Sequence, residues 1–230
     1  MKLARIAISF ILLFPFTAMS QEKEKRGLEF GIKAGFQAVT YNNPEFEIDG
    51  YSFDSNNIQS SKIGYTIAPF VRCVFNRFYL QTEVALGLTR HIFEFSDMGA
   101  IRTDVIPSTS VYELNTYCIQ TPLLFGYNFI DQRVFGMSVF TGPRVKNTLI
   151  SRSKQKFNNF KYSDLYENLK KTIFYWELGL GVKIDNVFFD FVYDIGLNNT
   201  TRYIESKQDG KKFKCRRSDN ILRFSIGLIF

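Results

Sequence analysis

The feature that most constrains this chain is a strict alternation of apolar residues with polar or small ones, repeated in eight separate segments. In the first segment the apolar set is Leu28, Phe30, Ile32, Ala34, Phe36 and Ala38. The residues between them are Glu29, Gly31, Lys33, Gly35 and Gln37. Successive side chains of a β-strand point to opposite faces, so this period of two predicts a strand with one apolar face and one polar face.

Seven further segments repeat the pattern, at about 62–75, 78–95, 111–129, 134–149, 172–184, 187–198 and 221–230. A tilted strand needs about 9–11 residues to cross a bilayer, whereas strands of soluble proteins are usually shorter, about 5–6 residues. The connections also alternate. Short turns at 76–77, 130–133 and 185–186 alternate along the chain with long loops at 41–61, 96–110, 150–171 and 199–219. Short periplasmic turns and long outer loops are typical of outer-membrane barrels.

The predicted fold is therefore all-β: an eight-stranded, antiparallel, up-and-down transmembrane β-barrel. The sheet must close, because an open edge in hydrocarbon would leave backbone groups without hydrogen bonds. The aromatic content of 17% fits strands, and no segment after the N-terminal one is apolar for the roughly 20 residues that a membrane helix needs. A soluble periplasmic β-protein is the alternative, but its rows of Phe and Leu would need another surface to cover them.

The N-terminus predicts export. Lys2 and Arg5 precede the apolar run 6–16, and Ala18-Met19-Ser20 follows it. This order is that of a signal peptide, and we expect cleavage between Ser20 and Gln21. The expected domains are thus a signal peptide at 1–20 and an outer-membrane barrel at 21–230. An amphipathic or buried N-terminal helix is the alternative. Export argues against nucleic acid as the partner of this chain, despite its net charge of +7.

The C-terminus ends an alternating apolar segment at Phe230. A terminal Phe after such a segment resembles the signal that the barrel assembly machinery reads. We therefore expect that machinery to be a partner and the outer membrane to be the destination.

Short motifs in five of the predicted strands extend this resemblance. They are Phe30-Gly31-Ile32-Lys33-Ala34-Gly35, Thr121-Pro122-Leu123-Leu124, Thr141-Gly142-Pro143, Gly179-Leu180-Gly181 and Tyr193-Asp194-Ile195-Gly196-Leu197-Asn198-Asn199. In these motifs and their order the chain resembles the PorT-like outer-membrane β-barrel family. The resemblance covers essentially the whole mature chain and implies the fold more than a role. It also raises a component of a protein secretion apparatus of type IX as one possible function.

Charged residues occupy many of the predicted interior positions. They are Lys33, Arg72, Arg144, Lys183 and Arg223 with Glu29, Glu83, Glu177, Asp190 and Asp194. An eight-stranded barrel is filled by side chains, and buried charges need partners of opposite sign. We expect a structural, mutually neutralising network in the lumen. A narrow ion or proton path, or a binding site at the mouth, are the alternatives.

Basic residues dominate the third and fourth long loops. They are Arg152, Lys154, Lys156, Lys161, Lys170, Lys171, Arg202, Lys207, Lys211, Lys212, Lys214, Arg216 and Arg217. These cations suit membrane lipid and the phosphates of lipopolysaccharide, or else a protein partner or an anionic glycan. The function expected is a non-enzymatic structural or interaction role in the envelope. The alternatives are a secretion component or a narrow small-solute channel.

Enzyme chemistry finds little support in the sequence. His91 is the only histidine, and we expect it to be interfacial and partly solvated. In barrels that deacylate lipid A, His and Ser two positions apart share a face, whereas Phe93 takes that position here. No spacing favours a triad of His91 with Ser110 and a glutamate, so we predict no catalytic, cofactor or metal residues. Cys73, Cys118 and Cys215 are expected to be unpaired, with a Cys118–Cys215 bridge as the alternative.

Overall fold

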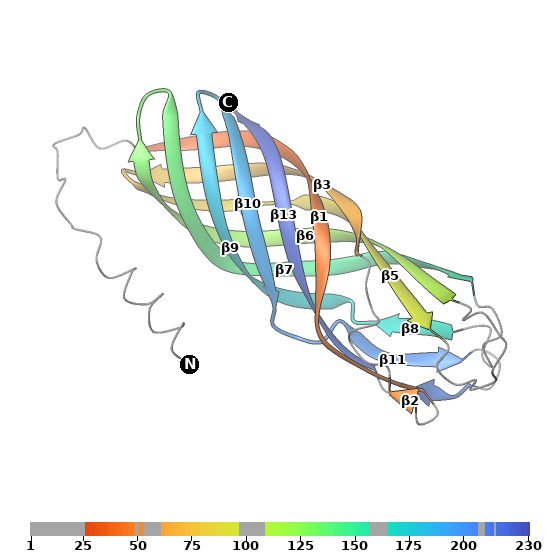
Figure 1. Cartoon of the computed structure of the whole chain (residues 1–230). Helices are drawn as coiled ribbons and strands as arrows, with labels where there is room; N and C mark the ends of the chain where they lie inside the picture. The colour runs from red at the N-terminus through yellow and green to blue at the C-terminus, as the bar shows by residue number, and fades with distance from the viewer. Residues whose placement is uncertain are drawn as a thin grey trace, which may run out of the picture.

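A computed structural model describes residues 26–48, 51–52, 61–96, 109–156, 165–206, 210–213 and 215–230. Within these residues eight long antiparallel strands form a closed barrel (Figure 1). In chain order they are β1 (Arg26–Ile48), β3 (Ser61–Phe75), β4 with β5 (Phe78–Glu83 and Ala85–Ser96), β6 (Thr109–Asp131), β7 (Phe135–Lys156), β9 (Thr172–Ile184), β10 (Val187–Gly196) and β13 (Cys215–Ile229).

Closure joins the first strand to the last. β1 pairs with β3 on one side and with β13 on the other, so that Ala34 faces Ile67 across one seam and Ile226 across the other. Every other neighbouring pair follows chain order. The predicted fold class is confirmed, and no helix in the described part of the chain is long and apolar enough to span a membrane.

Tight turns close the hairpins at one end. Asn76 and Asp185 adopt left-handed φ angles of 59° and 53° in the turns that join β3 to β4 and β9 to β10. Asn and Asp tolerate this region better than most residues, and turns with positive φ match the twist of the strands that they connect. By the general rule for such barrels, this end faces the periplasm.

At the opposite end the strands run further than predicted. β1 continues to Ile48, β7 to Lys156, and β13 begins at Cys215, so the predicted loops 41–61, 150–171 and 199–219 are partly strand. A small second sheet of β8 (Leu165–Leu169), β11 (Thr201–Ser206) and β12 (Lys212–Phe213) lies there, and β2 (Tyr51–Ser52) pairs with β1. Outside the bilayer neither face of a strand must be apolar, so the alternation that predicts strands fades there.

Two local irregularities also depart from the expected pattern. The predicted strand 78–95 is interrupted at Val84, whose N–H donates to the carbonyl of Pro69 at 3.2 Å. In β3 the register shifts between Lys62 and Tyr65, which adds one residue to that strand relative to β5. Such a bulge changes which face the residues beyond it occupy.

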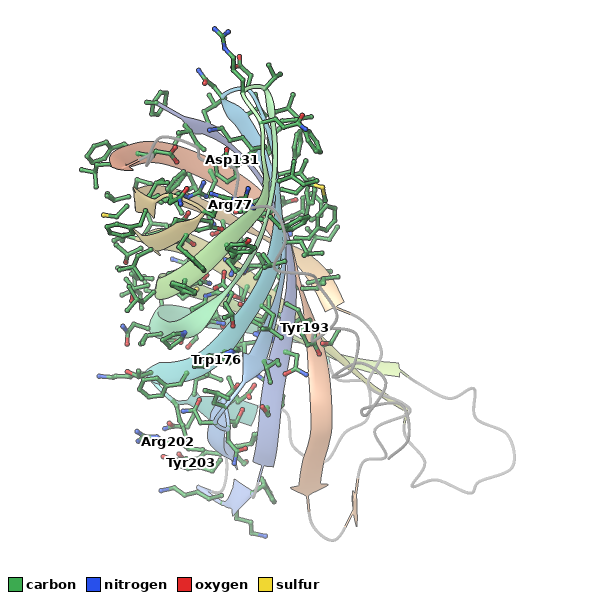
Figure 2. The ribbon with its side chains drawn as sticks, turned by 90° about the vertical axis from the view of Figure 1, so that its left-hand side faces the viewer. Arg77, Asp131, Trp176, Tyr193, Arg202 and Tyr203 are labelled. Atoms are coloured by element: carbon green, nitrogen blue, oxygen red, sulfur yellow. The ribbon has the colours of Figure 1, made fainter. Side chains whose placement is uncertain are left out.

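The outer surface of the barrel carries a broad apolar region formed by all eight strands. Large exposed side chains come from all eight strands, among them Phe30, Ile67, Leu86, Leu123, Val139, Leu180, Phe191 and Ile226. Figure 2 places Trp176 and Tyr193 between the end with Arg77 and Asp131 and the end with Arg202 and Tyr203. This surface is what a strand wall facing lipid requires.

Candidate functional site

Aromatic rings fill much of the lumen by lying over glycines. Four inward rings sit directly opposite an inward glycine of the neighbouring strand, in the pairs Phe70–Gly31, Tyr79–Gly126, Phe140–Gly179 and Phe188–Gly227. A Cβ atom added at any of these glycines would lie within 2.5 Å of the ring. The glycines therefore make the room that the rings occupy.

These rings belong to apolar clusters inside the barrel. One consists of Phe70, Phe188 and Ile229, and a second of Tyr79, Leu124, Phe140 and Val192. A third consists of Val39, Ile173, Tyr175 and Ile221. The alternation predicts an interior of polar and small side chains, which these apolar residues do not fit, although the inward glycines opposite four of the rings were a usable signal.

Seven of the charged residues predicted for the lumen come together in one cluster. The Lys33 ammonium lies 2.6 Å from a Glu83 oxygen and 3.2 Å from Asp190. The Arg223 guanidinium lies 2.7 Å from Glu177, 3.0 Å from Asp194 and 3.9 Å from Glu83. Arg144 also donates to Asp194. We call these seven residues the lumen cluster: Lys33, Glu83, Arg144, Glu177, Asp190, Asp194 and Arg223.

The other three predicted residues, Glu29, Arg72 and Lys183, lie towards the periplasmic end. Arg72 donates to Gln81 at 2.8 Å, and its guanidinium lies 4.4 Å from the centre of the Tyr79 ring. The nearest carboxylate oxygen to Arg72, from Glu29, is 3.7 Å away. Lys183 is half-buried and forms no ion pair with a described residue. All three line a pocket of about 190 Å³.

A second buried polar group lies nearer the outer mouth. Arg217 contacts Glu167 at 3.1 Å and Asp219 at 2.9 Å, and Lys146 donates to Thr89 at 3.2 Å. Glu167, Arg217 and Asp219 fall in the predicted loops 150–171 and 199–219. Arg223 and Ile221 point inward, and counting back by two along β13 reaches Asp219 and then Arg217. This alternation could have revealed the inward positions of Asp219 and Arg217.

The prediction for His91 is wrong. The side chain is 2% exposed and points into the lumen rather than to the interface. Its position follows from parity, because Thr89 and Gly87 of the same strand also point inward.

Basic side chains form a row on the outer surface of the barrel. Lys62 pairs in register with Arg90, Arg90 with Asn115, and Asn115 with Arg152, across β3, β5, β6 and β7. We call Lys62, Arg90 and Arg152 the basic row. Counting by two along the strand from the inward residues Arg72 and Thr66 predicts an inward Lys62, but its side chain is 48% exposed and lies 3.5 Å from Glu113. The bulge in β3 accounts for this reversal.

An apolar row lies next to the basic row, on the side nearer the membrane. It consists of Tyr65, Leu88, Tyr117 and Ile150, which pair in register across the same four strands. Arg90 lies over the Tyr65 ring at 5.7 Å. The two rows therefore mark the change from lipid-facing wall to polar outer rim on this side of the barrel.

The remaining predicted residues are placed as follows. Cys118 is buried and free, so the alternative Cys118–Cys215 bridge is not formed, and Cys73 is also free. The N–H of Phe230 donates to the Phe30 carbonyl at 2.8 Å, while its ring is 78% exposed. The signal peptide and its Ser20/Gln21 cleavage site lie outside the described residues. Within those residues no group of His, Cys, Asp and Glu is arranged to hold a metal ion.

Comparisons with known proteins agree with this architecture. The family model described as "Outer membrane protein beta-barrel domain" matches residues 19–202. The outer membrane protein OprG from Pseudomonas aeruginosa is similar in structure, with a TM-score of 0.54 at 12% identity, over 89% of this chain and 97% of that one. At this identity the likeness shows the fold alone.

Two smaller similarities are found with other barrels. Ail from Yersinia pestis has a TM-score of 0.37 at 16% identity, over 88% of this chain and 99% of that one. The Neisserial surface protein NspA has a TM-score of 0.36 at 14% identity, over 90% and 99%. No curated protein matches the chain in sequence. The family match does not separate PorT-like members from other outer-membrane barrels, so that resemblance stays a prediction.

Proposed function

Because the chain belongs to the outer membrane protein β-barrel domain family, we propose that it is a non-enzymatic envelope protein that binds lipopolysaccharide phosphates at its outer rim. The observation that carries this proposal is the basic row lying one step outside the apolar row of Tyr65, Leu88, Tyr117 and Ile150. In this proposal the second sheet of β8, β11 and β12, outside the membrane, is left for contact with a protein partner.

The order of the two rows suits an anionic headgroup. The apolar outer face of a membrane barrel ends at the edge of the hydrocarbon layer, and the next residues outward along the strands lie among the lipid headgroups. Arginine binds phosphate through two parallel charge-assisted hydrogen bonds. Arg152 is exposed and has no ion pair with a described residue, so its guanidinium is available to such a group. Lys62 is already close to Glu113, which makes Arg90 and Arg152 the main candidates.

The lumen argues against a channel as the main function. The three apolar clusters lie inside a barrel of the size that side chains normally fill. A catalytic role is also disfavoured, because the buried position of His91 does not suit a base that must meet a lipid substrate. Both arguments favour a role carried by the outer surface.

A role in a secretion apparatus is the second candidate, and it rests on the PorT-like resemblance and on the second sheet. Arg202, Lys211 and Lys212 are exposed there, and the Lys212 ammonium lies 4.8 Å from the centre of the Tyr203 ring. Photo-cross-linking from position 202 in cells, followed by identification of the captured proteins, tests this candidate. Capture of secretion components would support it, and capture of lipopolysaccharide alone would count against it.

The test of the lipid proposal is a double charge reversal, Arg90→Glu with Arg152→Glu. The protein is refolded in zwitterionic detergent, and its unfolding temperature is measured with and without added lipopolysaccharide. We expect lipopolysaccharide to raise the unfolding temperature of the unchanged protein, because a ligand that binds only the folded state stabilises it. The double variant should lose most of this rise.

The matched control reverses two charges at the periplasmic end, Arg77→Glu with Arg133→Glu, in the turn regions after β3 and β6. These changes alter net charge by the same amount but lie at the end of the barrel with the tight turns, opposite the end that carries the basic row. An equal loss of the rise in both double variants would contradict a specific site. Full retention by the Arg90 and Arg152 variant would do so as well.

A further inference from the structure

The charges of the lumen cluster do not balance. Lys33, Arg144 and Arg223 supply three positive charges, whereas Glu83, Glu177, Asp190 and Asp194 supply four carboxylates. All seven side chains are almost fully buried. An unbalanced charge in such a place is costly, and a buried acid commonly becomes neutral instead.

Two of the acids face each other directly. Glu177 of β9 and Asp194 of β10 are register partners, and both point into the lumen. Like charges at directly opposed positions of a sheet repel. When two carboxylates share a site, one of them tends to keep its proton.

The hydrogen bonds are divided unequally between these two acids. Asp194 accepts hydrogen bonds from Arg144 and from both Nε and Nη2 of Arg223. Glu177 lies 2.7 Å from Arg223 Nη2, yet neither of its oxygens accepts a hydrogen bond. The ionised form is therefore better stabilised at Asp194 than at Glu177.

The surroundings of Glu177 contain both signs of charge. Arg223 of β13 and Arg144 of β7 attract a negative charge there, whereas Asp194 of β10 and Glu83 of β4 repel it. Both arginines already serve Asp194, and Lys33 of β1 lies between Glu83 and Asp190. Glu177 is thus the acid with the least support for its negative charge.

We propose that the lumen cluster is a single-proton binding site and that Glu177 carries this proton in the folded barrel. With Glu177 neutral, three cations face three carboxylates. A free glutamate is ionised near neutral pH, so folding takes up one proton from water onto a Glu177 oxygen. No other group changes its bonding, and no co-reactant is needed.

The direct test is infrared spectroscopy of the refolded full-length mature protein in lipid vesicles, comparing the unchanged chain with Glu177→Gln. The carbonyl stretch of a protonated carboxyl is separate from that of a carboxylate. We expect this band at neutral pH in the unchanged protein and its loss in the Glu177→Gln variant. The control Glu113→Gln removes a carboxyl of the outer rim and should leave the band in place.

Stability supplies a second measurement. Glutamine reproduces the shape and the neutrality of protonated Glu177, so Glu177→Gln should fold with an unchanged or smaller unfolding equilibrium constant. Asp194→Asn removes the negative charge that faces two buried arginines and replaces one accepting oxygen by an NH2 group, and we expect it to raise that constant by about 100-fold or more. Folding of Glu177→Gln as poor as that of Asp194→Asn would overturn the proposal.

The sign of the pH dependence gives a third check. Since the folded state holds one proton more than the unfolded state, stability falls as pH rises while Glu177 keeps its proton. Relative to Glu177→Gln, the unfolding equilibrium constant of the unchanged protein should therefore rise by up to about tenfold per pH unit over the range in which folded Glu177 keeps its proton and the unfolded glutamate has lost it. An equal pH dependence in both proteins would contradict a bound proton. So would a stability difference that follows sodium concentration rather than pH, because it would assign the fourth charge to a metal cation.

Discussion

Contacts between inward rings and inward glycines set how tightly the lumen is filled. Tyr79 lies against Gly126 so closely that an added Cβ would come within 2.0 Å of its ring. The Tyr79 hydroxyl also donates to Ser138, and the ring lies beside Arg72. The ring is therefore held from several sides and has little room to move.

We predict that Gly126→Ala destabilises the barrel by about 1–3 kcal/mol, the usual cost of overpacking a filled interior. Urea unfolding in lipid vesicles, followed by tryptophan fluorescence of Trp176, measures this change. Gly27→Ala is the matched control, because no atom lies within 4 Å of its added Cβ. An equal effect of the two substitutions would show that the Tyr79 contact is not the cause.

At the scale of single residues, the face of the strand on which most side chains lie could be predicted, but local changes of face could not. The inward positions of Lys33, Glu83 and Arg223 follow from counting by two along their strands. Lys62 lies beyond a bulge, which leaves no clear mark in the sequence, so its predicted direction was reversed. His91 follows the alternation of its strand and points inward. The prediction failed because it considered only how near His91 lies to the membrane boundary and not which face of the strand it occupies.

At the scale of strands, the part inside the membrane could be predicted and the part beyond it could not. Strands that contact lipid need an apolar outer face, and this requirement produces the alternation of apolar and polar residues in β9 and β10. Outside the bilayer, β7 and β13 are held by backbone pairing with their neighbours. Such pairing constrains side chains only weakly, so the outer extensions and the second sheet were assigned to loops.

The last strand carries a prediction of its own. Deletion of Phe230 should lower the amount of protein assembled in the outer membrane of cells, if the terminal ring is the part that the assembly machinery reads. The residue is largely exposed, and its backbone N–H donates to the Phe30 carbonyl of β1, so refolding of the purified variant into vesicles should be nearly unchanged. Quantifying the folded protein in both settings separates recognition from stability.

The control for this deletion is Phe191→Ala, which removes an exposed ring from the middle of the lipid-facing wall. We expect it to alter assembly in cells and refolding in vesicles to a similar extent. A Phe230 deletion that lowers both equally would argue for a structural role of the terminal ring and against its role as a signal.

At the scale of the whole molecule, the barrel combines a lipid-facing wall, a filled interior and a basic outer rim. The interior is filled by apolar clusters and held together by buried ion pairs, so we assign its residues to stability rather than to transport. Under the proposed function, the outer rim and the second sheet are the parts that contact lipopolysaccharide or a protein partner. Both assignments require that the sheet is closed and embedded in the outer membrane.

Closure is tested most directly by a disulfide across the seam between β1 and β13. Ala34 and Ile226 are register partners on the outer face, so Ala34→Cys with Ile226→Cys, in a chain whose native cysteines are replaced by serine, should cross-link. We expect the outer-membrane fraction to contain the cross-linked form, with a mobility on unboiled gels that changes on boiling. Absence of the cross-link, in a protein that stays soluble in the periplasm with no such change, would contradict the closed barrel.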